Sequence, residues 1–563
     1  MPTSIIKSKH TIAAPETNLL SYIFDAPYND AGAWPATEPI LVPANAASDC
    51  PGYTIDEIKS LVKRLGNGLH TIGARGKRVM VYGEANIHFP IAVLGAIAAG
   101  AAVNILAPSP AEYLVPRLRQ LECDIVLLSP NQADIEAVGE AARELGISAK
   151  RLFMIDEKFK KPSTSAGGPE TGPRHWGALL DIPGGDEYEW PRLSSTEAKN
   201  TTAVLSYTSG TTGTPKLACR THHNLVGNIA QALHHDNLLP RTHEITSCVF
   251  KFAGMGFLLI GILIPLKARY RHIFLPGADV SSFTQMVERF RPTTVIAPPH
   301  VMRETLALLS SSSVRPDLSS VRHVHTGGGI ISWDLVDTWQ KAFGSRVLNT
   351  YAMTEGGIFT APHPGEPVTD AATGILLPDI EAKIIDDNGA IAPRNQKGTV
   401  CIRTPFVMKG YLNKPAQTAE TVTEDGWIIT GDIGWIDERE LVYVVGRWKD
   451  MFKIRNHEVT VSEIEAAASR HPAVQDVAVI PVVPQEGEEY VPRGYIVKKE
   501  GSDISADELI SWMQQEFPPW IQLLGGAAFI DAIPIASTGN SKVDRRKLAE
   551  MAERELRVVN GEK

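Results

Sequence analysis

Residues 208–216 read Thr208-Ser209-Gly210-Thr211-Thr212-Gly213-Thr214-Pro215-Lys216 and directly follow a run of strand-forming residues, 202–207. Glycine lacks a Cβ, so backbone N–H groups in this stretch can turn together toward an anion, and the hydroxyl groups add donors at side-chain length. Lys216 brings a positive charge to the same loop. The stretch therefore predicts a strand that ends in a polyphosphate-binding loop.

This loop departs from the nucleoside-triphosphate P-loop, in which a Gly-Lys-Ser/Thr run opens directly into a helix. Here Pro215 precedes Lys216 and disfavours helical geometry at Thr214, so we expect an extended segment over 217–220. A helix is then expected to begin at Thr221, whose hydroxyl suits an N-cap. Taken alone, the composition also fits an ordinary Ser/Thr/Gly surface loop, and the motifs downstream decide between the two interpretations.

The size and charge of the chain limit its architecture and its partners. Its 563 residues and mass of 61.2 kDa exceed what one hydrophobic core normally holds, which predicts at least two domains. The formal net charge of −9 and the isoelectric point near 6.0 offer no general attraction to nucleic acid or to a membrane, so neither is expected as a partner. An anionic ligand must then be held by a local basic site.

The five cysteines are widely spaced, odd in number and free of any Cys-x-x-Cys pair, which favours reduced thiols over disulfides or a zinc site. The longest apolar run, 252–266, is too short to span a bilayer and predicts a buried helix. Residues 1–10 show no secretory signal, and the final tripeptide is not a peroxisomal import signal. The expectation is a soluble, cytoplasmic protein.

Strand-like and helix-like segments alternate over most of the chain. Segments 78–82, 125–128 and 294–297 are rich in strand formers, and 91–102 is an Ala/Gly-rich helical stretch. Such alternation is typical of α/β layers with largely parallel sheets.

Near Gly446 the pattern changes to mixed α+β, with helices expected at 461–469 and 506–517 and strands at 477–480 and 495–497. The predicted fold class is therefore α/β, with two domains. Residues 1–446 form a large N-terminal domain of layered α/β subdomains, and residues 447–563 form a small α+β C-terminal domain.

Four further motifs follow the phosphate loop in order: Tyr351-Ala352-Met353-Thr354-Glu355, Thr430-Gly431-Asp432, Gly446-Arg447-Trp448-Lys449-Asp450 with Lys453, and Lys542-Val543-Asp544-Arg545-Arg546. Together the five motifs resemble the adenylate-forming superfamily of acyl-CoA ligases, peptide-synthetase adenylation domains and beetle luciferases. The resemblance covers residues 53–548. It is strongest to the coumarate–CoA-ligase-like branch, on the segments Cys401-Ile402-Arg403, Met408-Lys409-Gly410-Tyr411 and His471-Pro472-Ala473-Val474.

The resemblance implies a nucleotide site built from all five motifs. The β- and γ-phosphates of ATP are assigned to Thr208, Ser209, Gly210, Thr211, Thr212, Gly213 and Lys216, the α-phosphate to Thr354, and the ribose hydroxyls to Asp432 and Arg447. Asn349, Thr350 and Lys453 complete the nucleotide-binding set, and Glu355 is assigned to the Mg²⁺ that bridges the phosphates. The predicted catalytic residues are Lys216, Thr354, Glu355 and Lys542, the last bridging the carboxylate and the α-phosphate.

The same resemblance implies an acid pocket and a mobile small domain. Gly327, Gly328, Gly329 and Tyr351 are assigned to the adenine and one pocket wall, and Phe252, Ala253, Gly356 and Ile358 to the rest of the acid pocket. Lys449 matches the hinge about which the small domain rotates between the two half-reactions. Taken singly, Lys542 also fits a solvated basic surface, Asp432 a turn, Glu355 a helix cap and the three glycines a tight turn.

The implied chemistry is activation of a carboxylic acid. A carboxylate oxygen is too basic to leave when a thiol attacks, and transfer of AMP to it, with release of pyrophosphate, turns that oxygen into part of a stable phosphate. The leading hypothesis is an ATP-dependent carboxylic acid–CoA ligase that forms acyl-AMP and then acyl-CoA, with an aromatic or medium-chain apolar acid. Two alternatives stay open: transfer to a carrier-protein thiol or to an amine in trans, and a non-catalytic nucleotide-binding relative.

Four departures from the family pattern bear on these alternatives. Leu217 stands where glycine is usual, and Phe252-Ala253 replaces a Phe-His pair, which predicts a roomier acid pocket. Asn456 and Glu458 replace a glycine and a glutamine of the loop that lines the pantetheine tunnel, where an asparagine side chain narrows the space. Two extra residues, Asn540-Ser541, precede Lys542, so the lysine is either displaced or returned to register by a bulge.

Overall fold

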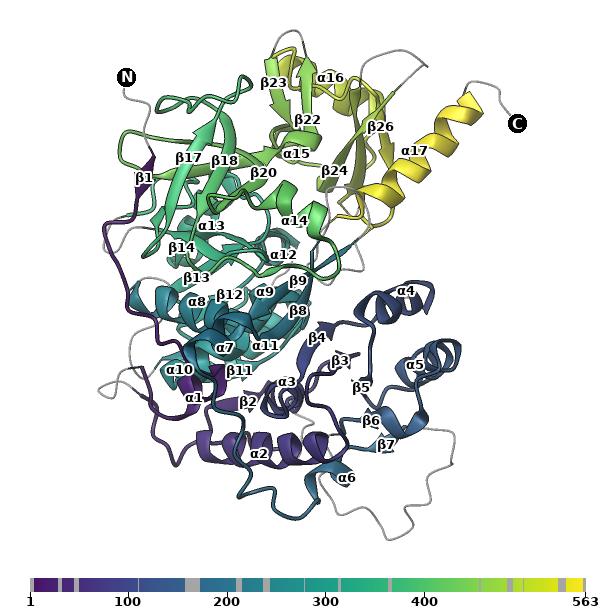
Figure 1. Ribbon diagram of the computed structural model, residues 1–563. Coiled ribbons are helices and arrows are strands. Elements are labelled where there is room, and N and C mark those ends of the chain that lie inside the picture. Colours follow the sequence, from purple (N-terminus) through teal and green to yellow (C-terminus); the bar gives the residue numbers. More distant parts are fainter. Residues whose placement is uncertain are drawn as a thin grey trace.

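The computed structural model describes residues 5–28, 33–44, 50–109, 111–156, 173–208, 215–235, 244–277, 279–311, 315–362, 367–454, 457–483, 490–499, 501–534 and 543–559. Within these ranges the strands form two eight-stranded sheets, one five-stranded sheet and two small sheets of three and two strands (Figure 1). The three large sheets use strands up to residue 447, and the two small sheets use those beyond it.

The first eight-stranded sheet occupies the lower half of Figure 1 in the order β19-β9-β8-β4-β3-β5-β6-β7. Its strands are β3 (Arg78–Tyr82), β4 (Ala102–Leu106), β5 (Ile125–Leu128), β6 (Leu152–Met154), β7 (Arg174–His175), β8 (Thr202–Thr208), β9 (Lys216–Thr221) and β19 (Gly410–Tyr411). The six strands β8, β4, β3, β5, β6 and β7 run parallel to one another. At the other edge of the sheet, β9 is antiparallel to β8 and β19 is antiparallel to β9. The predicted parallel α/β layering is therefore present here.

Helices cover both faces of this sheet, because alternate strand residues point to opposite sides. Val79 and Val81 of β3 pack on the face of α2 (Ile55–Thr71), α3 (Phe89–Ala98) and α6 (Gly177–Leu180). Met80 and Tyr82 pack on the face of α4 (Ala111–Leu121) and α5 (Gln132–Leu145). A 3₁₀ turn (Ala149–Arg151) leads into β6, and α7 (Ser195–Asn200) leads into β8.

The second eight-stranded sheet has the order β16-β15-β14-β13-β12-β10-β11-β2. Its strands are β2 (Leu41–Pro43), β10 (Ile245–Cys248), β11 (Arg271–Phe274), β12 (Thr294–Ile296), β13 (His323–Gly327), β14 (Arg346–Met353), β15 (Gly357–Ala361) and β16 (Ile375–Leu376). The six strands β2, β11, β10, β12, β13 and β14 run parallel to one another. Strand β15 is antiparallel to β14, and β16 is antiparallel to β15.

The helices around this second sheet also form two layers. One layer comprises α1 (Leu19–Phe24), α8 (His222–His234), α9 (Gly254–Gly256), a π-helical turn (Phe257–Leu263) and α10 (Ile264–Ala268). The other comprises α11 (Val280–Phe290), α12 (Pro299–Ser311) and α13 (Trp333–Phe343). The apolar run 252–266 is thus a buried helical segment, as the sequence predicts, although a π-helical turn occupies its middle.

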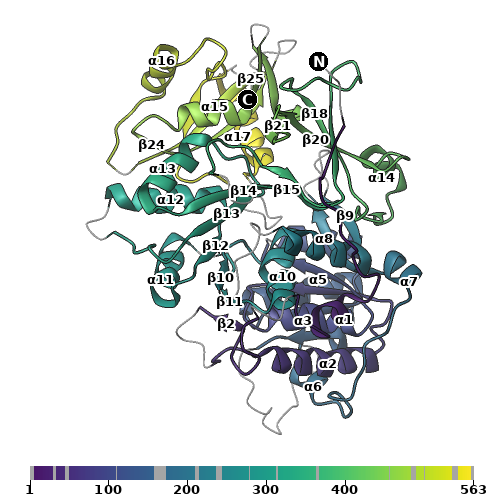
Figure 2. The same ribbon diagram turned by 90° about the vertical axis from the view of Figure 1, so that its left-hand side faces the viewer.

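The five-stranded sheet is antiparallel, in the order β1-β17-β18-β20-β21. Its strands are β1 (Ile6–Lys7), β17 (Glu381–Ile385), β18 (Gly398–Arg403), β20 (Trp427–Ile436) and β21 (Val442–Arg447), and α14 (Pro415–Thr421) lies between β19 and β20 in the chain. Figure 2 shows β1, near the N-terminus, beside this sheet in the upper half of the molecule.

The C-terminal part is the α+β unit that the sequence predicts. After a 3₁₀ turn (Trp448–Asp450) come β22 (Met451–Ile454), β23 (His457–Thr460), α15 (Val461–Ala468), β24 (Val474–Val482), β25 (Val491–Lys498), α16 (Ala506–Glu516), β26 (Ala527–Phe529) and α17 (Arg545–Val559). Two hydrophobic clusters consist only of residues from Phe452 onward. The predicted fold class, a large N-terminal and a small C-terminal domain, is confirmed, whereas the boundary after Gly446 and the mobility of the small domain stay predictions.

Local sequence explains several element boundaries. Thr221 caps α8, as predicted, through a capping box in which its side chain accepts from the Asn224 N–H. The helix predicted at 91–102 begins earlier and ends at Ala98, because Gly100 adopts a φ of +77° and sends the chain into β4. None of the five cysteines, all of which lie in the described ranges, forms a disulfide, and no helix in those ranges is long and apolar enough to cross a bilayer.

Gly68, inside α2, provides a stability test because a Cβ there would lie 2.3 Å from the carbonyl oxygen of Leu179. We expect Gly68→Ala to lower the free energy of unfolding by about 1–3 kcal/mol, since backbone cannot move aside cheaply. Gly139, inside α5, is the matched control, because a Cβ added at Gly139 would have no atom within 4 Å. Gly139→Ala should raise stability by up to about 1 kcal/mol. Equal effects in urea unfolding would contradict the close packing at Gly68.

Buried histidines make stability depend on pH. Burial lowers the pKa of His88 and of His222 to about 4 and that of His272 to about 3. The unfolded chain therefore takes up protons below its ordinary histidine pKa while the folded chain does not, and stability must fall as pH drops from about 6.5 toward 4. At pH 5.5 the loss should be on the order of 1 kcal/mol per histidine. Urea titrations at pH 7.5 and 5.5 that give the same free energy of unfolding would refute this.

Candidate active site

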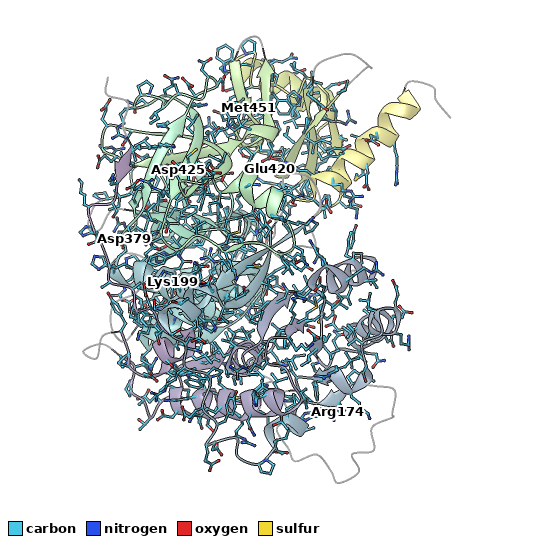
Figure 3. The ribbon with its side chains drawn as sticks, viewed as in Figure 1. Arg174, Lys199, Asp379, Glu420, Asp425 and Met451 are labelled. Atoms are coloured by element: carbon cyan, nitrogen blue, oxygen red, sulfur yellow. The ribbon has the colours of Figure 1, made fainter. Side chains whose placement is uncertain are left out.

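A cavity of about 2270 Å³ lies where the three large sheets meet, and it reaches α12, α13 and α15. The predicted site residues that line it are Thr208, Lys216, Ala253, Gly327, Gly328, Gly329, Asn349, Thr350, Tyr351, Thr354, Glu355, Ile358, Asp432 and Arg447. Glu420 on α14, which Figure 3 labels, also lines it. Residues from segments more than two hundred positions apart thus share one cavity.

The two ends of the predicted phosphate loop are held side by side. Thr208 ends β8 and Lys216 begins β9, and the two residues are register partners in the antiparallel pair. Gln120 on α4 donates to the Pro215 carbonyl oxygen at 2.8 Å. Residues Ser209, Gly210, Thr211, Thr212 and Gly213 lie outside the described residues, so their assignment to the phosphates stays a prediction.

Lys216 is buried against the aromatic ring of Tyr411. Its Nζ lies 5.0 Å from the ring centroid, a cation–π distance. The neighbourhood follows from sheet pairing: β19 pairs with β9, with Tyr411 opposite Ala218, two residues from Lys216 on the same face. Packing against Tyr411 therefore positions the ammonium group at the cavity wall.

Glu355 lies in the turn between β14 and β15 and is 6% exposed. The Tyr411 hydroxyl donates to its Oε1 at 2.6 Å, and the Met408 N–H donates to its carbonyl oxygen at 2.7 Å. Burial first, and then the Glu355 charge, raises the pKa of Tyr411, so the phenol keeps the proton that it donates. Glu355 Oε2 accepts no hydrogen bond from the described residues, which leaves that oxygen available to a cation.

The two residues predicted to bind the ribose lie on paired strands. Asp432 of β20 lies opposite Arg447 of β21, whose Nε donates to Asp432 Oδ1 at 2.9 Å. The Tyr351 hydroxyl donates to Asp432 Oδ2 at 2.6 Å. Burial and the Asp432 charge raise the pKa of Tyr351 well above its ordinary value, so it stays protonated. A carboxylate has about four acceptor positions, so two remain for hydroxyl groups of a ligand.

Sequence reasoning missed Arg220, the residue that joins these parts. Arg220 in β9 is fully buried, and its Nη1 donates to the carbonyl oxygen of Thr354 at 2.8 Å. Its Nη2 donates to the side chain of Asn228 on α8 and to the carbonyl oxygen of Phe406, at 3.3 Å in the second case. Burial lowers the pKa of Arg220 to about 10, opposed by Glu355, so the guanidinium is charged at neutral pH.

One sequence signal for Arg220 was present. A predicted extended segment alternates its side chains, so Lys216 and Arg220, four positions apart, must share a face of β9. The structure confirms this alternation, since Leu217 and Cys219 pack in the opposite cluster with α4 and α5. What the sequence does not show is that the shared face turns toward Thr354.

Comparison with known proteins identifies the family. A sequence model of the AMP-binding enzyme family matches residues 42–412, and one of the AMP-binding enzyme C-terminal domain matches residues 463–542. The chain belongs to the AMP-binding enzyme family. The predicted membership of the adenylate-forming superfamily and the predicted enzyme class, an AMP-forming acid–thiol ligase, are therefore confirmed.

Relatives of this AMP-binding enzyme include the 4-coumarate–CoA ligase of Vanilla planifolia, 29% identical over 525 residues that cover 91% of this chain and 90% of the relative. The 4-coumarate–CoA ligase 2 of Nicotiana tabacum is 30% identical over 511 residues, 88% of this chain and 89% of the relative. Among solved structures, ATP-bound MatB from Rhodopseudomonas palustris has a TM-score of 0.78 at 24% identity, covering 96% of this chain and 99% of MatB. The anthranilate–CoA ligase AuaEII, in complex with anthranoyl-AMP, has a TM-score of 0.80 at 20% identity, with 96% and 98% covered.

Two residues assigned to the acid pocket of this enzyme lie elsewhere. Phe252 is not among the cavity-lining residues, because its ring packs in an aromatic cluster with Phe89, Phe257 and Phe274 at centroid distances of 5.2 to 6.0 Å. Gly356 does not line the cavity either, since it packs against the Phe359 ring so closely that a Cβ on Gly356 would lie 2.4 Å from it. Ala253 and Ile358 do line it.

The remaining assignments fall near the small domain. Lys542 lies outside the described residues, but Val543, Asp544 and Arg545, which follow it directly, line the cavity. Arg545 is held there by an ion pair with Glu465 of α15, with Nη2 and Oε1 2.7 Å apart. Lys449 lies in the 3₁₀ turn and Lys453 in β22, and the structure does not describe the side chains of these two lysines. Asn456 lies outside the described residues. The roles of these lysines and the effect of Asn456 stay predictions.

The protein groups at the cavity suit a magnesium ion whose ligands come mostly from the phosphates of a bound nucleotide. In the described part of the chain no three His, Cys, Asp or Glu side chains gather at a metal site, whereas Glu355 offers one buried carboxylate with a free Oε2. Mg²⁺ in nucleotide sites commonly takes one or two carboxylates together with phosphate oxygens and water. Glu355 is thus a suitable single protein ligand.

Arg220→Met tests whether the buried guanidinium holds the Thr354 turn. The substitution leaves the partly buried carbonyl oxygen of Thr354 and the buried one of Phe406 without this donor, so we expect a loss of about 3 kcal/mol in unfolding free energy. Arg119→Met is the matched control, because the side chain of Arg119 is 62% exposed and forms a surface ion pair with Glu144. It should change stability by less than about 0.5 kcal/mol. A denaturant midpoint for Arg220→Met as high as that of the control would contradict the role of Arg220.

Proposed function

We propose that this AMP-binding enzyme is an ATP-dependent carboxylic acid–CoA ligase that forms acyl-AMP and then acyl-CoA. The observation that carries the proposal is that the ends of the phosphate loop, the Thr354–Glu355 turn, and the Asp432–Arg447 pair line one cavity, with the residues after Lys542 on its wall. The two relatives described above, which match 91% and 88% of this chain, are 4-coumarate–CoA ligases.

In the first step an oxygen of the acid's carboxylate attacks the α-phosphorus of ATP, the bond to the bridging oxygen breaks, and pyrophosphate leaves. We assign Lys216 and the loop 208–213 to the β- and γ-phosphates, and Thr354 to the α-phosphate. Fixed donors and cations aimed at the places where negative charge develops lower the barrier. A Mg²⁺ ion at Glu355 would neutralise phosphate charge.

The ribose and adenine are assigned to a second group of cavity-lining residues. Asp432, oriented by Arg447 and Tyr351, has two acceptor positions for the ribose hydroxyls. Part of the cavity wall is backbone without side chains, contributed by Gly327, Gly328 and Gly329. A Cβ on Gly327 would lie 2.8 Å from the Thr350 carbonyl oxygen. Asn349 and Thr350 line the cavity beside them.

In the second step the CoA thiolate attacks the acyl carbon, and AMP leaves with the bonding electrons. The burial of Cys123, Cys219, Cys248 and Cys401 raises the pKa of each thiol, so none of these four is suited to act as an acyl-carrying nucleophile itself. This supports an acceptor thiol supplied from outside the chain. A carrier-protein thiol or an amine remains the alternative acceptor.

An aromatic or medium-chain apolar acid fits the walls of the cavity. Met255, Phe257, Leu259, Ile260, Ile264, Ile296 and Ile358 are among the lining residues. Ala253 lines the cavity as well, so the small side chain predicted to widen the acid pocket faces it. Location in the cytoplasm stays a prediction.

Acid-dependent ATP–pyrophosphate exchange over a panel of aromatic and aliphatic acids tests the first step. Lys542→Ala should lower exchange about 10²- to 10³-fold while ATP binding changes little, because its charge is needed where carboxylate and phosphate meet. Lys547→Ala, an exposed lysine of the same basic cluster that does not line the cavity, should leave exchange unchanged.

Three outcomes separate the hypotheses. Absence of exchange with every acid would remove the proposal of acid activation and favour a non-catalytic relative. Exchange without acyl-CoA formation when CoA is added would move the acceptor to a carrier protein or an amine. Equal exchange by Lys542→Ala and Lys547→Ala would show that Lys542 is a solvated surface residue.

A further inference from the structure

The imidazole ring of His325 is a polar side chain in a row of apolar side chains that crosses the second eight-stranded sheet. The register places Phe274, Cys248, Ile296, His325 and Leu348 side by side on strands β11, β10, β12, β13 and β14. Registered neighbours in a parallel sheet point to the same face, here the face covered by α8 and the π-helical turn. His325 is therefore a hydrogen-bonding side chain in a position where its neighbours are apolar.

His325 is 5% exposed, and the little surface it retains faces the cavity. The cavity wall near this face is apolar, formed by Ala232 of α8, Leu259 of the π-helical turn and Ile296 of β12. No side-chain hydrogen bond to the His325 ring is made by any residue in the described ranges. In the described part of the chain the His325 ring nitrogens are not among the fully buried side-chain atoms that lack a partner, so they keep contact with the cavity, where a ligand can supply one.

The surroundings of His325 also keep its ring uncharged. Burial, followed by the nearby positive or titratable groups His323, His235 and Arg346, lowers the pKa of His325 to about 3. His235, the C-cap of α8, is engaged with the Pro362 carbonyl oxygen at 3.1 Å, and no acidic group is among those that act on His325. At neutral pH the ring thus offers one N–H donor and one nitrogen acceptor to a neutral polar group.

We infer that His325 determines substrate specificity by hydrogen bonding to a neutral polar substituent, such as a hydroxyl group, on the otherwise apolar body of the acid. The inference rests on the proposed acid activation and deepens it. A hydroxyl group can donate to one ring nitrogen or accept from the other, whereas a methyl group of similar size leaves the ring unpaired. The substrate is therefore apolar along the cavity wall and polar at the point that meets His325.

The experiment compares matched acids in the full-length enzyme with ATP and Mg²⁺. Benzoic, phenylacetic and phenylpropenoic acids, each with a para-hydroxyl or a para-methyl group, are paired with straight-chain acids that end in hydroxyl or methyl. The kcat/KM for pyrophosphate release is measured for both members of each pair. The wild type should favour the hydroxyl member at least tenfold in the best pair, which corresponds to about 1.4 kcal/mol.

His325→Leu should reduce that preference to within twofold, chiefly by raising KM for the hydroxyl member and improving the methyl member. His325→Gln, which keeps a donor and an acceptor, should retain part of the preference. His272→Leu is the matched control: His272 is a buried histidine on the same face of the same sheet, bonded to Thr246 at 2.9 Å and absent from the cavity wall. It should leave the preference unchanged.

The outcomes distinguish this inference from the proposed function. If no acid supports pyrophosphate release, the proposed function fails and the inference fails with it. If acids are activated but the wild type favours the methyl members or neither, the inference alone is wrong, whatever the folding of the variants. A preference that persists in His325→Leu would also overturn it.

Discussion

The buried guanidinium of Arg220 is the interaction on which the arrangement of the site depends. It donates to backbone carbonyl oxygens at Thr354 and Phe406 and to Asn228, so it connects β9, α8, the turn after β14 and the segment that leads to β19. A buried charge is expensive unless hydrogen bonds surround it, and the carbonyl and amide oxygens around Arg220 supply them. The same bonds hold Glu355, the residue after Thr354, at the cavity.

Two tyrosine hydroxyls orient the carboxylates that line the cavity. Tyr411 donates to Glu355 and also faces the Lys216 ammonium group, while Tyr351 donates to Asp432. Both phenols have a raised pKa because they are buried beside carboxylates, so each remains a donor and holds its carboxylate in one orientation. The carboxylates are thereby oriented before a nucleotide binds, which reduces the reorganisation needed on binding.

Two histidines of the second sheet show that burial alone does not distinguish a side chain packed inside the protein from one that meets the cavity. His272 and His325 share a face of the second sheet, and burial keeps both uncharged. His272 has a protein partner in Thr246, whereas His325 meets the cavity. Polar side chains that look equivalent in a strand therefore differ in what the fold leaves for them to bind.

The sequence by itself determined the layered α/β class, the strand before the predicted phosphate loop and the helix capped by Thr221, and it predicted site residues, many of which line one cavity. These follow from local rules: period-two and helical patterns, hydroxyl caps, and glycine and proline preferences, together with motifs whose order survives in the chain. Only the tertiary structure decided that Arg220 turns toward Thr354, that Phe252 packs in an aromatic cluster and does not line the cavity, and that His325 stands among apolar side chains. Those outcomes depend on which faces of distant strands meet, and such pairings arise from packing between segments far apart in the chain rather than from the residues beside each position.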